Sequence, residues 1–137
     1  MKLVKIVSIY KILGEAKTDK LSEEDIIKIL KNRKILKHYV DEFELFLVTC
    51  QDSLKPDSFD IIQDKINNWD NITDEEKIDV KKVLSEYQEK LNKAILEEQE
   101  KDYNITLEKL PTESIISLAK DSNLEFNKIE ELLEFND

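Results

Sequence analysis

The chain has 137 residues, 40% of them hydrophobic and 38% charged, and a formal net charge of −10. This length fits one domain of ordinary size, so a single helical domain over residues 1–137 is expected. With one Gly, one His and one Cys, the chain lacks the residues for a Gly-rich phosphate loop, a disulfide or a His/Cys zinc site. We therefore expect no bound metal and no cofactor.

The first helix is expected over residues 2–13, where apolar side chains recur at helical spacing. Gly14 follows this stripe and is the expected C-terminal stop, since a glycine readily adopts the left-handed conformation that ends many helices. The polar residues 17–20 are expected to form a turn.

A long amphipathic helix is expected over about 22–55. Ser22 and Asp25 match the pattern of a capped helix start, and Pro56 ends the element because its ring clashes with a continuing helix. The polar run 31–34 interrupts the apolar stripe, which predicts a bend or a short break there.

Two further helices follow Pro56. A short one starts near Ser58 and carries Phe59 and Ile62 on its apolar face. The next is a second long amphipathic helix over about 74–101, which begins at the capping box formed by Thr73 and Glu76.

The remainder of the chain is less regular. Tyr103, Ile105 and Leu107 alternate with polar residues, which predicts a short extended segment over 103–110 that lies across the helices. Pro111 then opens a helix, and a final short helix follows the turn at Asn123. Residues 111–137 are thus a candidate small C-terminal helical pair.

Together these elements predict an all-α fold of about six helices, organised by the two long helices as an elongated hairpin or bundle. The two long helices are expected to bury each other through apolar residues on both sides. These residues are Val40, Phe43, Leu47, Val83, Tyr87 and Leu91.

Candidate catalytic groups are scarce. His38 and Cys50 are twelve positions apart, about 18 Å along a continuous helix, which is too far for a catalytic dyad. Cys50 lies on the apolar side of its helix and is expected to be buried and unreactive. We therefore expect no enzymatic activity, although an enzyme that uses only carboxylates and lysines is an alternative.

Charge is distributed unevenly, at +5 over residues 1–38 and −15 over residues 39–137. Around His38 the basic residues form one cluster, which either packs against the acidic helices or provides a docking patch. The candidate partner-binding residues are Lys28, Lys31, Arg33, Lys34 and Lys37.

One resemblance concerns the order of features along most of the chain. The stretch 9–17 (IYKILGEAK) precedes a long helix with Glu42-Phe43, and the isolated Trp69 and a long amphipathic helix follow. This order resembles small, acidic, all-helical proteins of bacteriophages and prophages of gut bacteria. The resemblance implies a phage or mobile-element origin, and it brings no functional residues with it.

The expected function is a non-enzymatic structural or protein-interaction role, as a virion or assembly component, with protein partners or further copies of the chain. No stretch has the length and hydropathy of a membrane span, so the expected location is the cytoplasm of the host cell or the virion. The alternative is a small regulator or inhibitor that acts on nucleic acid, or on a nucleic-acid enzyme, through the basic segment 28–38.

Overall fold

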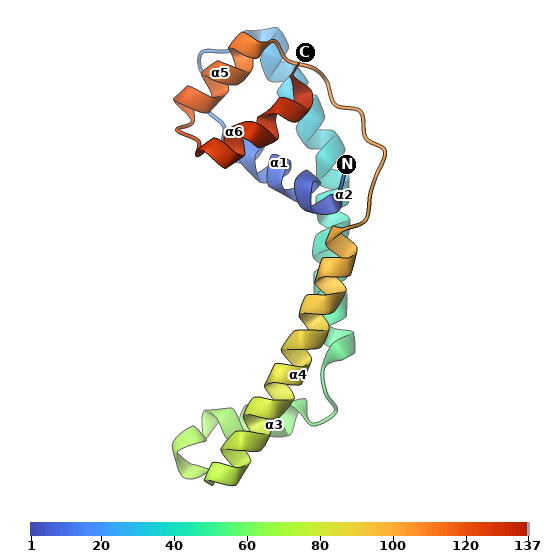
Figure 1. Ribbon diagram of the computed structural model, residues 1–137, viewed down its shortest axis with the longest axis vertical. Coiled ribbons are helices and arrows are strands. Elements are labelled where there is room, and N and C mark those ends of the chain that lie inside the picture. Colours follow the sequence, from blue (N-terminus) through green and yellow to red (C-terminus); the bar gives the residue numbers. More distant parts are fainter. Residues whose placement is uncertain (137) are drawn as a thin grey trace. The chain divides into compact units, whose positions relative to one another are not determined.

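The computed structural model describes residues 1–136 and shows an all-α protein (Figure 1). No β-strand occurs over these residues, although two isolated bridges join extended backbone. The helices, including two short 3₁₀ turns, are α1 (Leu3–Glu15), α2 (Glu23–Leu54), α3 (Phe59–Asn67), η1 (Trp69–Asn71), α4 (Asp74–Gln99), α5 (Thr112–Asp121), α6 (Phe126–Leu132) and η2 (Leu133–Phe135). The predicted six-helix fold with two long helices is confirmed.

Two compact units make up the chain. The core unit contains Met1–Phe43 and the residues from Gln99 onward, and the hairpin unit contains Glu44–Glu98. Helix α2 begins in the core unit and ends in the hairpin unit.

In the core unit, α1, the first part of α2, α5, α6 and the extended segment surround one apolar cluster. Fully buried members include Ile6, Leu36, Leu118 and Phe135. The extended segment contributes Leu107 and Leu110 to the same cluster, so the predicted packing of this segment over the helices is confirmed. The cluster comprises Ile6, Ile9, Ile12, Leu13, Ile29, Leu36, Val40, Leu107, Leu110, Ile115, Leu118, Leu132 and Phe135.

In the hairpin unit, the last turns of α2 lie beside α4, and α3 follows Pro56 (Figure 1). The Tyr87 hydroxyl donates a hydrogen bond of 2.8 Å to the carbonyl oxygen of Gln51, which fixes the register of the pair. Leu91 and Cys50 are buried, as the sequence predicts. Val40 was expected at this helix contact and instead belongs to the apolar cluster of the core unit.

The helix starts follow local sequence. Glu76 and Thr73 cap α4 reciprocally, with the Glu76 N–H donating to Thr73 Oγ1 at 3.2 Å and the Thr73 N–H to Glu76 Oε1 at 3.5 Å. The Asp25 N–H donates to Ser22 Oγ at 3.2 Å at the start of α2. Asn123 has a φ of 52° and closes the turn after α5.

The prediction for Gly14 was wrong. Gly14 lies inside α1, which continues to Glu15, and its φ is not positive. A Cβ atom at this position would lie 3.1 Å from Nη2 of Arg33. The glycine therefore provides room for an arginine of α2 and does not terminate the helix.

The predicted short break at residues 31–34 is also absent, because α2 is one continuous helix from Glu23 to Leu54. Asn32 is fully buried and hydrogen-bonds the backbone of Glu108. The Arg33 guanidinium lies 4.6 Å from the centre of the Tyr10 ring. Asn32 thus has a polar partner and Arg33 an aromatic one. The helix continues through the polar run although its apolar stripe is interrupted there.

Candidate functional site

The candidate site is a shallow cleft in the core unit beside α1 and α6. Its volume is about 630 Å³, within the range of small-molecule sites. It is lined by Met1, Lys2, Val4, Lys5, Ser8, Asp102, Glu131 and Glu134. Basic residues come from the start of α1, and acidic residues come from α6, η2 and the segment after α4.

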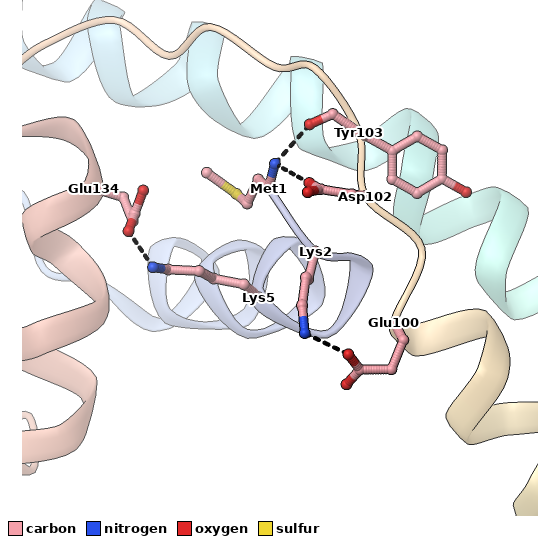
Figure 2. Close-up of polar contacts among 7 residues, drawn as sticks. All are labelled: Met1, Lys2, Lys5, Glu100, Asp102, Tyr103 and Glu134. Atoms are coloured by element: carbon pink, nitrogen blue, oxygen red, sulfur yellow. Dashed lines mark hydrogen bonds and ion pairs between the residues drawn. The ribbon is translucent and has the colours of Figure 1, made fainter.

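Most of these charged groups are paired, as Figure 2 shows. The ammonium group of Met1 lies 2.6 Å from Asp102 Oδ1 and donates to the carbonyl oxygen of Tyr103, also at 2.6 Å. Lys2 pairs with Glu100 and Lys5 with Glu134. These contacts hold the start of α1 against two segments that are distant in sequence.

Hydrogen bonding shifts two pKa values at this rim. The hydrogen bond from the terminal ammonium, together with its charge, holds the pKa of Asp102 below the ordinary value of 3.8. The hydrogen bond to Glu100 and its charge raise the pKa of Lys2 above 10.5. Both contacts stabilise the charged forms of these exposed groups, and the shifted pKa values reflect this.

Glu131 is the exception among the charged residues of the cleft. Its Oε2 atom is shielded from solvent and has no hydrogen-bond partner within the described residues. Ser8 also lines the cleft, but His38 does not, so no histidine base accompanies this hydroxyl. Ser8 is therefore not part of a serine–histidine pair in this cleft.

The residues of the predicted basic cluster are exposed or half-buried along α2, and most have a partner. Lys28 lies 3.5 Å from Glu24, Lys31 3.9 Å from Glu108, and Lys37 2.5 Å from Asp41. His38 Nε2 lies 3.3 Å from Glu42. Carboxylates thus accompany most of the cluster.

Arg33 and Lys34 are the other two residues of the basic cluster, and their surroundings differ. Arg33 stacks on Tyr10 of α1, whereas Lys34 is exposed and has no ion-pair partner over residues 1–136. The structure therefore does not gather these basic residues around one pocket, and none of them lines the cleft.

The cleft was not identified from the sequence. The ion pairs at its rim, Lys2 with Glu100 and Lys5 with Glu134, join residues 98 and 129 positions apart in the sequence. Local spacing therefore carried no signal for this cleft.

In the part of the chain that the structure describes, no three His, Cys, Asp or Glu side chains come together as potential metal ligands. No helix among residues 1–136 has both the length and the hydropathy needed to cross a membrane. Comparison with known proteins finds no matching family model, no similar curated protein and no similar solved structure.

Proposed function

We propose that this protein is a non-enzymatic interaction protein that functions within a protein assembly. The observation that carries the proposal is the surface of the hairpin unit, which buries few apolar side chains and exposes more. Its buried apolar residues are Cys50, Ile62, Val80 and Leu91, and its exposed large ones are Leu45, Val48, Ile61, Ile66, Ile78 and Leu96.

Among these exposed residues, one pair on α2 is adjacent and one pair on α4 shares a helix face. Leu45 and Val48 are three positions apart, on the side of α2 opposite to the buried Cys50. Ile78 and Leu96 are eighteen positions, or five turns, apart, and both lie opposite Leu91 on α4. Exposed apolar side chains that lie together on a surface are candidates for protein association.

We also propose an origin and a location for this protein. The resemblance of its order of features to that of phage and prophage proteins supports a role as a virion or assembly component. The corresponding location is the cytoplasm of the host cell or the particle itself. The proposed role requires no metal or cofactor.

A photo-crosslinking experiment tests this function. A benzoylphenylalanine placed at Val48, in cells that produce the protein, should give one defined protein adduct. The matched control carries the same group at Lys11, an exposed position on α1, and should give no defined adduct. Leu45→Lys should abolish the Val48 adduct by adding a charge beside it. A protein without adducts from either position would contradict the proposal.

Nucleic-acid binding through residues 28–38 is the alternative. The paired lysines of this segment favour protein interaction over a phosphate-binding surface, since a carboxylate beside a lysine offsets its attraction for a phosphate. Binding of a DNA duplex should be measured against salt for the protein and for a variant with Lys31, Lys34 and Lys37 replaced by Glu. Salt-dependent binding that is lost in the variant would favour the alternative.

A further inference from the structure

Helix α2 carries two exposed patches, each of which combines two apolar side chains with two charged ones. The basic patch consists of Ile27, Leu30, Lys31 and Lys34. The acidic patch consists of Asp41, Glu44, Leu45 and Val48. The apolar side chains of the two patches are between 52% and 68% exposed, and the charged ones are exposed as well. The described part of the chain therefore leaves both patches open to solvent.

Both patches lie on the same side of one helix. Within each patch the four residues have the spacing i, i+3, i+4 and i+7, which places them on a single helix face. Ile27 and Leu45 are eighteen positions apart, and eighteen residues make five full turns. Because α2 is unbroken from Glu23 to Leu54, its exposed side carries one patch after the other.

The order of residue types is reversed between the two patches. Along the chain, the basic patch has its apolar pair first and its lysines second, whereas the acidic patch has its carboxylates first and its apolar pair second. Two copies of α2 placed antiparallel therefore bring apolar side chains against apolar ones and lysines against carboxylates, at both patches at once. A parallel alignment would place lysines against lysines. An interface between two symmetric copies requires this kind of self-complementarity.

We propose that a second copy of this chain binds the exposed face of α2, with the basic patch of each copy against the acidic patch of the other. This pairing rests on the proposed interaction function and names one partner for it. Charged groups across an interface determine the choice and orientation of the partner more than the affinity. The apolar side chains of both patches supply the buried contact.

Charged residues without a partner in their own chain occur in both patches. Lys31 lies 3.9 Å from Glu108, and Asp41 lies 2.5 Å from Lys37. Over residues 1–136, by contrast, neither Lys34 nor Glu44 has an ion-pair partner. Each patch therefore offers one charge that only a further molecule can pair, and the two charges have opposite sign.

The residues between the two patches do not oppose this pairing. Lys37 and His38 lie at the centre of the exposed face, where two antiparallel copies would bring them near each other. Each of them lies beside a carboxylate of its own helix, Asp41 at 2.5 Å and Glu42 at 3.3 Å. These carboxylates offset the like charges that meet at the centre.

Reversing the charges of one patch tests the pairing. One variant carries Lys31→Glu and Lys34→Glu, and a second variant carries Asp41→Lys and Glu44→Lys. Each variant by itself sets like charges against each other at both contacts. Light scattering should therefore show a dimer dissociation constant at least tenfold higher than that of the parent protein, while circular dichroism should show unchanged helix content.

A mixture of the two variants restores the complementary charges. The introduced glutamates of one variant face the introduced lysines of the other, and the unaltered patches of the two variants also match. A heterodimer should form with a dissociation constant within threefold of that of the parent dimer. A monomeric parent protein, or a mixture of folded variants without a heterodimer, would overturn the proposal.

The matched control for net charge carries Lys90→Glu and Lys93→Glu, at exposed positions of α4. This variant has the same net charge as the one with two glutamates in the basic patch. It should retain the dissociation constant of the parent dimer. Equal weakening in this control would show that net charge decides the association and that the patches do not.

The crosslink at Val48 separates this pairing from the interaction function itself. In purified protein, benzoylphenylalanine at Val48 should give an adduct with the mass of two copies, joined to residues 27–34 of the second copy. An adduct formed in cells with a different protein alone would support the interaction function and overturn the pairing. The absence of any adduct would contradict both.

Discussion

Asn32 of α2 and Glu108 of the extended segment are joined by two hydrogen bonds. The Glu108 N–H donates to Asn32 Oδ1 at 2.7 Å, and Asn32 Nδ2 donates to the Glu108 carbonyl oxygen at 3.0 Å. The amide side chain thus takes the place that a neighbouring strand would occupy. It anchors a segment 76 positions away in sequence.

Replacing Asn32 with Ala should therefore destabilise the core unit by about 1–3 kcal/mol, the usual cost of leaving buried polar groups without partners. Urea unfolding followed by circular dichroism measures this change. Lys31→Ala is the matched control, because it removes only the exposed ion pair with Glu108, and it should cost about 0–1 kcal/mol. Equal effects of the two changes would contradict an anchoring role for Asn32.

In the hairpin unit, Leu91→Ala should cost about 2–5 kcal/mol because it leaves a cavity at a buried position. Leu96→Ala, on the exposed side of the same helix, should change stability by less than about 0.5 kcal/mol. Trp69 is the only tryptophan and lies in this unit, so its fluorescence reports local unfolding. A larger effect at Leu96 would show that the register of the helix pair is wrong.

Gly14→Ala has two opposing effects. Alanine favours a helix interior over glycine by up to about 1 kcal/mol, but the new Cβ crowds the Arg33 guanidinium. We expect a modest rise in melting temperature, since the end of an arginine side chain can shift. In an Arg33→Ala background the same change should raise it further. An identical gain in both backgrounds would show that the two residues do not interact.

The contact between Met1 and Asp102 predicts a pH dependence. Because the folded state lowers the pKa of Asp102, its stabilising effect is present above the unfolded pKa and is lost as pH falls through the folded pKa. An NMR titration of the Asp102 carboxyl group should show a midpoint below 3.8. Acetylation of the terminal amine should raise this midpoint, and an unchanged midpoint would contradict the assigned cause.

Burial of Cys50 should make its thiol unreactive in the folded protein. A thiol reagent should label native protein at least tenfold more slowly than protein in urea. Leu91→Ala should increase the native rate by opening the hairpin unit more often. Rapid labelling of the native parent protein would show that Cys50 is accessible.

The sequence by itself determined the features that depend on neighbouring residues. The capping box at Thr73 and Glu76, the stop at Pro56 and the 3.6-residue spacing of apolar side chains act over one or two helical turns. The helices could therefore be predicted to within a few residues. The alternation at Tyr103, Ile105 and Leu107 likewise identified the extended segment, because side-chain direction in an extended chain follows a period of two.

Tertiary structure alone decided the positions where distant segments meet. Gly14 was predicted to end a helix, yet it accommodates Arg33. The polar run 31–34 was predicted to bend or briefly break a helix, yet the helix is unbroken and Asn32 anchors the extended segment. The cleft joins residues from both ends of the core unit's sequence. In each case the partner residue that decides the structure is far away along the chain. Periodicity and capping patterns describe only neighbouring residues, so they cannot identify such a partner.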